Sequence, residues 1–178
     1  MITLITGGAR SGKSSYAESL YKDKKDVVYM ATSKVLDDEM AERVKLHQSS
    51  RPREWRTYEG NYDLQEALGD EGNYLLDCIT VLTSNIMYDI SKDLDYIGYE
   101  VQERIENTVV TELENLINSV NERAYNLILV TNEVGYSIVP EHHISRVFRD
   151  IQGRVNQRIA ALADEVYLVC CGIPVTIK

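Results

Sequence analysis

The sequence has little cysteine and no long hydrophobic run, and each shortage excludes a class of protein. Its three cysteines, Cys78, Cys170 and Cys171, are too few and too unevenly spaced for a disulfide framework or a zinc site. We expect them to be buried, reduced thiols. No apolar run approaches the roughly 18 residues of a membrane-spanning helix, and the N-terminus lacks the charged region, apolar core and cleavage site of a signal peptide. We therefore expect a cytoplasmic protein with no membrane span.

Basic residues are also scarce relative to acidic ones. The 178-residue chain has 19 Lys and Arg against 28 Asp and Glu, a formal net charge of −9. Because affinity for nucleic acid is largely the neutralisation of phosphates by basic side chains, this chain is a poor bulk binder of nucleic acid. An anionic ligand must instead be held by local features, such as backbone N–H groups and a few cations. The length, without repeats or low-complexity segments, predicts a single domain over residues 1–178.

Alternating strand and helix patterns predict the fold class. Near-continuous apolar runs are typical of buried parallel strands, and they cover residues 1–6, 26–32, 74–78, 126–132 and 165–171. Weaker strands are predicted at 55–59 and, as an edge hairpin through Gly172, at 173–178. Helical spacing covers residues 14–21, 37–48, 94–124 and 144–163. This alternation predicts a doubly wound α/β fold with a mostly parallel sheet, whose ligands bind at the carboxyl ends of the strands.

A complete phosphate-loop motif stands between the first predicted strand and the first predicted helix. Gly7, Gly12, Lys13 and Ser14 match the pattern G-x-x-x-x-G-K-[ST]. The glycines permit backbone angles that turn N–H groups inward at a helix N-terminus, where the helix dipole also favours anions. Lys13 is expected to reach the β- and γ-phosphates, and the Ser14 hydroxyl to ligate Mg²⁺. We therefore predict a site for a nucleoside triphosphate, with Mg²⁺ as the cofactor.

Three more side chains are candidates for the chemistry. Asp77 closes a buried strand, where a carboxylate either holds the magnesium ion, directly or through water, or caps the helix that follows. His47 lies near the end of the second predicted helix, and it is either a nucleophile toward phosphorus or a structural residue at a helix C-terminus. Glu133, after the fourth predicted strand, is a reserve candidate near the metal or in structuring the loop.

Other basic positions allow more than one interpretation. His142 and His143 fall in a predicted loop, and we expect them to be exposed to solvent. Arg154 and Arg158 lie four residues apart on the last predicted helix. They either face an anionic substrate or pair with acidic side chains on a solvated surface.

Segments spread along the whole chain resemble one enzyme family. They read "TGGARSGKS", "ATSKVLDDEMAERVKLHQSSRPREWRTYE", "LLDCIT", "TNEVGYSIVPE" and "FRDIQGRVNQRIAALADEVYLV". In this order they are similar to the bifunctional adenosylcobinamide kinases/adenosylcobinamide-phosphate guanylyltransferases of cobalamin biosynthesis. The resemblance implies a P-loop NTPase fold of the RecA-like kind and two reactions. ATP or GTP phosphorylates the aminopropanol hydroxyl of adenosylcobinamide. GTP then transfers GMP to adenosylcobinamide phosphate, which gives adenosylcobinamide-GDP and pyrophosphate.

The resemblance also implies the roles of individual residues. Lys13 and His47 are the implied catalytic residues, with His47 carrying GMP as a phosphoramidate; some relatives have two adjacent histidines where this chain has Leu46-His47. The implied nucleotide contacts are Gly7, Gly8, Ala9, Arg10, Ser11, Gly12, Lys13, Ser14, Ala31, Thr32, Ser33, Gln48, Ser49, Ser50, Arg51, Glu59 and Asp77. The implied metal ligands are Ser14 and Asp77, although some relatives have glutamate at the latter position. Relatives are trimers, so a homotrimer is expected.

The phosphate loop alone also fits other functions. One is a kinase for another small metabolite, in which His47 is merely structural. Another is a nucleotide-driven binding module, such as a recombinase-like ATPase that acts on DNA, against which the net charge of −9 argues. A switch-type GTP-binding protein would carry an N-K-x-D segment, which the sequence lacks.

Overall fold

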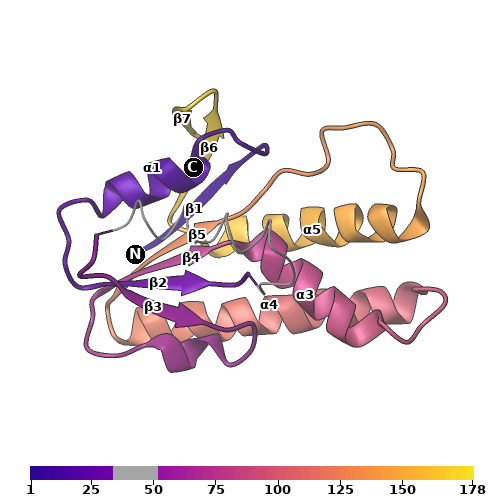
Figure 1. Cartoon of the computed structure of the whole chain (residues 1–178), viewed down its shortest axis with the longest axis horizontal. Coiled ribbons are helices and arrows are strands. Elements are labelled where there is room, and N and C mark those ends of the chain that lie inside the picture. Colours follow the sequence, from indigo (N-terminus) through magenta and orange to yellow (C-terminus); the bar gives the residue numbers. More distant parts are fainter. Residues whose placement is uncertain (34–51) are drawn as a thin grey trace.

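A seven-stranded, mostly parallel sheet organises the chain in the computed structural model, which describes residues 1–33 and 52–178. The strands are β1 (Ile2–Gly7), β2 (Val27–Ala31), β3 (Arg56–Glu59), β4 (Asn73–Asp77), β5 (Asn126–Val130), β6 (Glu165–Cys170) and β7 (Ile173–Thr176). Their order is β3-β2-β4-β5-β1-β6-β7 (Figure 1). Only the pairing of β6 with β7 is antiparallel among these strands. The predicted fold class and C-terminal edge hairpin are confirmed.

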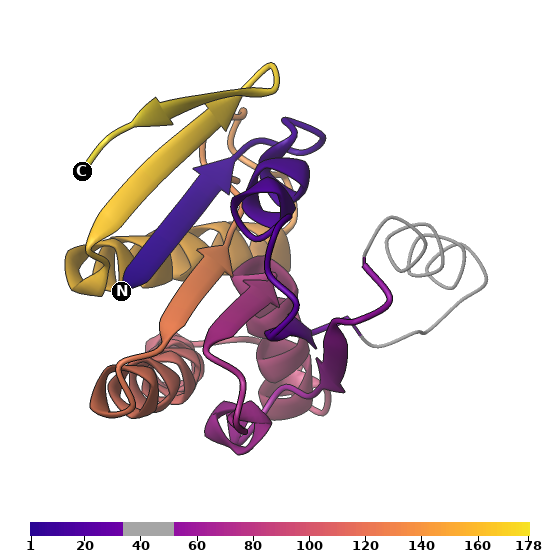
Figure 2. The ribbon, with the colours of Figure 1, turned by 90° about the vertical axis from the view of Figure 1, so that its left-hand side faces the viewer.

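Helices cover both faces of the sheet, as a doubly wound fold requires. They are α1 (Lys13–Leu20), the 3₁₀ helix η1 (Leu64–Ala67), α3 (Ile79–Ser91), α4 (Tyr99–Glu122) and α5 (His143–Leu162). Figure 2 shows α1 on one face and α3, α4 and α5 on the other. In the part of the chain that the structure describes, no helix is both long enough and apolar enough to cross a membrane. The predicted helix at 37–48 lies outside the described residues.

Each face of the sheet has its own hydrophobic core, because side chains alternate between the faces along a strand. On β4, Leu75 packs into the core beneath α1, whereas Leu76 packs into the larger core beneath α3, α4 and α5. Both leucines are fully buried. A buried leucine contributes about 1.5–3 kcal/mol, so the two cores hold the strand ends, and the loops that follow them, in fixed positions.

Several local expectations were wrong. The helix predicted over 94–124 begins at Tyr99, with Gly98 as its N-cap. Ile97 lies in the loop before this helix, but its side chain is buried, so it matched the helical spacing of apolar residues. Leu162, whose helical spacing with Ile151, Val155 and Ile159 predicts a core position, is 44% exposed at the end of α5. His143, expected in a solvent-exposed loop, begins α5, and its half-buried ring stacks on Tyr96 at a centroid distance of 4.4 Å.

The cysteines differ from one another in exposure. Cys78 is buried as expected, and burial raises the pKa of its thiol to about 11. Cys170 and Cys171 are exposed, because they end the outermost parallel strand and begin the turn into the edge hairpin. The expectation of three buried thiols was therefore wrong for this pair.

Arg154 and Arg158, two of the arginines of α5, pair with acidic side chains. Arg154 forms an ion pair with Glu106, and Arg158 forms one with Glu114, both across to α4. Of the two interpretations left open by the sequence, the structure supports the solvated, acid-paired surface.

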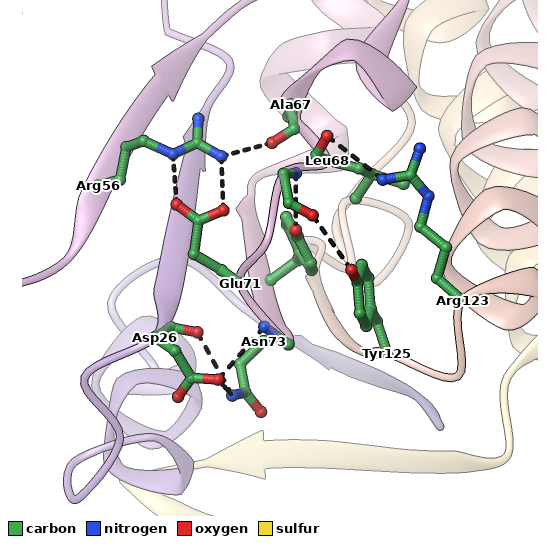
Figure 3. A network of polar contacts seen from close by, with 11 residues as sticks. Asp26, Arg56, Ala67, Leu68, Glu71, Asn73, Arg123 and Tyr125 are labelled. Atoms are coloured by element: carbon green, nitrogen blue, oxygen red, sulfur yellow. Dashed lines mark hydrogen bonds and ion pairs between the residues drawn. The ribbon is translucent and has the colours of Figure 1, made fainter.

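A polar network ties the connection between β3 and β4 to the amino-terminal edge of the sheet (Figure 3). Arg56 binds both carboxylate oxygens of Glu71, at 2.6 and 3.0 Å, and donates to the carbonyl oxygen of Ala67 at 2.7 Å. Beside it, the Asp26 carboxylate accepts from Asn73 Nδ2 at 2.9 Å. These contacts stabilise the edge of the sheet opposite the predicted ligand site.

Candidate nucleotide and transfer site

The strand register brings the predicted site residues of the described segments to one edge of the sheet. Ala31 pairs with Glu59 on one side and with Asp77 on the other. Asp77 pairs in turn with Val130, which pairs with Ile5 of β1. The phosphate loop begins at the end of β1, just beyond this row. The carboxyl ends of five strands therefore converge where a doubly wound sheet binds its ligands.

The phosphate loop requires glycine at Gly7 and Gly12. A Cβ on Gly7 would lie 2.5 Å from the carbonyl oxygen of Val169 and 2.6 Å from Ser11 Oγ. Gly12 has a φ of 94°, which L-amino acids other than glycine rarely adopt. The loop also contacts the β6–β7 turn, because the Gly172 N–H donates to the carbonyl oxygen of Ser11 at 2.8 Å. These contacts constrain the backbone of the loop at its first glycine, at Gly12 and at Ser11.

Donors of the loop are left for an anionic ligand. Gly12 is the N-cap of α1 and has no side-chain acceptor, so within the described residues the N–H groups of the first helical turn are left for a phosphate. Lys13 is buried, with 9% exposure, and its Nζ folds back to donate to the carbonyl oxygen of Gly8 at 3.2 Å. The Ser11 hydroxyl is buried and has no hydrogen-bond partner among the described residues. A buried hydroxyl of this kind normally has a partner.

Asp77 is free of the capping role that the sequence left open. The N-cap of α3 is Cys78, whose side chain makes no capping hydrogen bond. The half-buried Asp77 carboxylate instead accepts a hydrogen bond from Tyr29 Oη through Oδ2, at 3.0 Å. Within the described residues, Asp77 Oδ1 accepts no hydrogen bond. Ser14, on the first turn of α1, is also half-buried.

The oxygens of Ser14 and Asp77 suit a Mg²⁺ ion that is bound together with a nucleotide, rather than a metal ion held by protein ligands alone. Mg²⁺ prefers oxygen and commonly takes one or two protein ligands together with substrate phosphates and water. No cluster of three or more His, Cys, Asp or Glu side chains suited to a metal ion occurs in residues 1–33 and 52–178. The donor set of Ser14 and Asp77 therefore fits an ion that is bound with the nucleotide.

Thr32 joins the ends of β2 and β4. Its buried Oγ1 accepts from the Cys78 N–H at 3.0 Å and donates to the Cys78 carbonyl oxygen at 2.9 Å. Its own carbonyl oxygen accepts from Asn85 Nδ2 at 2.7 Å. The Thr32 hydroxyl thus uses its hydrogen bonds to hold the ends of β2 and β4 together. The neighbouring Ser33 is half-buried, and Glu59 is exposed at the sheet edge.

A buried polar network that sequence reasoning missed lies below the loop. Thr131 Oγ1 donates to Asn156 Oδ1 at 2.7 Å, and Gln152 Nε2 donates to the same oxygen at 2.8 Å. Asn156 Nδ2 donates in turn to Glu133 Oε1 at 3.2 Å. The available signal was that Gln152 and Asn156, four residues apart, interrupt the apolar face of the last predicted helix.

Comparison with known proteins decides the family. The family described as "Cobinamide kinase / cobinamide phosphate guanyltransferase" matches residues 3–177. The chain belongs to this family. It is 46% identical to the "Bifunctional adenosylcobalamin biosynthesis protein CobU" of Escherichia coli K12 and 45% identical to that of Salmonella typhimurium LT2. Both matches cover 100% of this chain and 100% of the relative.

The chain is also similar, at lower identity, to two further proteins. The "Bifunctional adenosylcobalamin biosynthesis protein CobP" of Pseudomonas aeruginosa PAO1 is 35% identical over 100% of this chain and 98% of its own length. A solved KaiC-like protein of Pyrococcus horikoshii OT3 has a TM-score of 0.48 at 13% identity and covers 94% of this chain and 69% of its own.

The cobinamide kinase assignment leaves one group of predicted residues without a structural account. His47 and the implied nucleotide contacts Gln48, Ser49, Ser50 and Arg51 lie outside the described residues. The remaining implied contacts belong to the loop and to the strand ends that the register brings together. Their roles toward a nucleotide remain predictions.

Proposed function

We propose that this protein is a bifunctional enzyme that phosphorylates adenosylcobinamide and then transfers GMP from GTP to adenosylcobinamide phosphate. The observation that carries the proposal is identity of 45–46% to two bifunctional relatives over the whole of both chains. The phosphate loop at the carboxyl edge of the sheet supports it, because both reactions act on a nucleoside triphosphate.

In the kinase step, the substrate hydroxyl attacks the γ-phosphorus of the bound nucleotide. The loop N–H groups and the Ser11 hydroxyl, which is buried and unpaired within the described part of the chain, would bind phosphate oxygens. Lys13 would leave the Gly8 carbonyl oxygen and neutralise charge on the β- and γ-phosphates. Ser14 and Asp77 would hold Mg²⁺, which when bound neutralises charge on the transferring phosphoryl group.

In the guanylyl step, His47 is the proposed nucleophile. A neutral imidazole nitrogen attacks the α-phosphorus of GTP, a nitrogen–phosphorus bond forms, and the bond from the α-phosphorus to its bridging oxygen breaks as pyrophosphate leaves. A phosphate oxygen of adenosylcobinamide phosphate then attacks the same phosphorus, and the imidazole departs. Two displacements of this kind divide one difficult transfer into two easier ones.

The nucleotide contacts and the assembly belong to the same proposal. Ala31, Thr32, Ser33 and Glu59 would contact the nucleotide from the strand ends, where Thr32 offers backbone rather than its committed side chain. A homotrimer in the cytoplasm agrees with the family resemblance of the sequence. Gel filtration with light scattering would test the trimer directly.

Labelling with GTP tests the proposed intermediate. Incubation with [α-³²P]GTP and Mg²⁺ is expected to label the wild-type protein through an acid-labile, alkali-stable bond, because phosphoramidates have this stability. His47→Ala is expected to lose the label and guanylyl transfer, while kinase activity largely remains. His142→Ala, at an exposed histidine, is the matched control and keeps both activities. Undiminished labelling of the His47 variant would refute the intermediate, and an unlabelled wild type with kinase activity would indicate a kinase alone.

A further inference from the structure

The strand before Glu133 lies between the strands that lead to the phosphate loop and to Asp77. Glu133 follows β5, the strand flanked by β1, which leads into the loop, and by β4, which ends at Asp77. The backbone N–H of Glu133 donates to the carbonyl oxygen of Gly7 at 3.1 Å. We propose that the Glu133 carboxylate is the general base of the kinase step, a role that rests on the kinase activity proposed above.

Hydrogen bonds hold one oxygen of the Glu133 carboxylate in place. Oε1 accepts from Thr6 Oγ1 at 3.1 Å and from Asn156 Nδ2 at 3.2 Å. Asn156 is itself fixed, because its Oδ1 accepts from Thr131 and from Gln152. Within residues 1–33 and 52–178, Oε2 has no hydrogen-bond partner, and the side chain is only half-buried. Among the residues that the structure describes, the carboxylate thus presents one oriented oxygen without a partner beside the loop.

An oxygen in this place fits the chemistry of transfer to a hydroxyl. Glu133 Oε2 accepts the hydroxyl proton while the hydroxyl oxygen forms its bond to the γ-phosphorus. The bond between the γ-phosphorus and the β–γ bridging oxygen breaks, and its electron pair leaves with the nucleoside diphosphate. A positioned base of this kind contributes about 10²- to 10⁴-fold to the rate.

The guanylyl step makes no such demand. Its acceptor is a phosphate monoester, which is largely dianionic near neutral pH because its second pKa is about 6. The acceptor therefore has no proton that must be removed during attack. If Glu133 is the base, its substitution should lower the kinase activity and spare GMP transfer. If Glu133 is structural or binds Mg²⁺, its substitution should lower both activities together.

The test is Glu133→Gln, whose amide oxygen can still accept from Thr6 and Asn156. We expect kcat for phosphate transfer from [γ-³²P]ATP or GTP to adenosylcobinamide to fall about 10²- to 10⁴-fold. KM for the nucleotide and labelling by [α-³²P]GTP are expected to stay at wild-type values. Glu141→Gln, at an exposed glutamate of the same connection between β5 and α5, is the matched control. Thr6→Val, which removes one anchor with little change of shape, should give a smaller loss of kcat with the same labelling.

Each result supports or overturns the proposal. Retained kinase activity in Glu133→Gln overturns it, and so does parallel loss of phosphate transfer and GMP labelling. Loss of phosphate transfer alone supports it. A wild type that labels but does not phosphorylate adenosylcobinamide refutes the proposed kinase function itself, so this failure is distinguishable from that of the base.

Discussion

Single residues of the phosphate loop are constrained by backbone atoms rather than by flexible side chains. At Gly7, the nearest neighbour of an added Cβ would be the carbonyl oxygen of Val169, which is fixed by the pairing of β1 with β6. A backbone atom in a sheet cannot move away without breaking that pairing. The loop therefore tolerates no side chain at its first position.

Gly7→Ala is expected to weaken both stability and nucleotide binding. Overpacking of this kind costs about 1–3 kcal/mol, and any relief moves the loop away from the conformation that binds phosphate. Gly153→Ala is the control, because a Cβ there meets no atom within 4 Å, and in a helix the change stabilises by up to about 1 kcal/mol. Urea unfolding and titration with GTP would measure the two effects. Wild-type affinity in Gly7→Ala would contradict this account of the loop.

Secondary-structure elements were predictable where one pattern ran through the whole element. The strands β1, β4 and β5 are near-continuous apolar runs, and α5 keeps its spacing from Val147 to Ile159. The start of α4 was not predictable, because a buried loop residue, Ile97, mimicked one more helical turn. The phosphate loop was predictable because its chemistry lies in consecutive residues.

The Glu133 network could be predicted only in part. Its contacts join residues that are far apart in the chain, such as Thr6 with Glu133, a separation of 127 positions. Hydrogen bonds of this kind depend on strand order and register, and no local periodicity encodes them. Glu133 itself was a reserve candidate because it follows a predicted strand, whereas the donors that orient it became visible only in the fold.

The Arg56–Glu71 pair at the opposite edge predicts a pH-dependent contribution to stability. The hydrogen bond from Arg56 lowers the pKa of Glu71 below its ordinary value. Stability from a lowered carboxyl pKa is present above the ordinary value and is lost as the pH falls through the lowered one. Because the side chains are 42% and 24% exposed, the expected contribution is below about 1 kcal/mol.

Glu71→Gln is therefore expected to be slightly less stable than wild type at pH 7 and equally stable in strong acid. Urea unfolding at both pH values measures the difference. The adjacent Asp70→Asn, at an exposed carboxylate, should show no such pH dependence. A deficit of Glu71→Gln that persists unchanged in acid would show that the pair does not act through charge.

For the whole molecule, nucleotide binding is expected to raise the melting temperature. The loop is anchored to strands on both sides, so a ligand bound there stabilises the entire folded chain by mass action. GTP with Mg²⁺ at 100 times its Kd adds about 2.7 kcal/mol, which corresponds to about 5–10 °C for a chain of this size. Lys13→Ala should lose most of this rise in melting temperature. The rise is measured for each protein relative to its own melting temperature without ligand. An equal shift in the variant would exclude Lys13 from phosphate binding.

The turn between β6 and β7 touches the phosphate loop through Gly172, and this contact has a consequence for how variants are interpreted. Cys171 and Gly172 both have positive φ, so the turn has few conformations available. Substitutions at these two positions, near the end of the sequence, should therefore behave as active-site substitutions, altering nucleotide affinity while the remote ends of the hairpin stay folded. A library designed to change nucleotide preference would include this turn together with the loop itself.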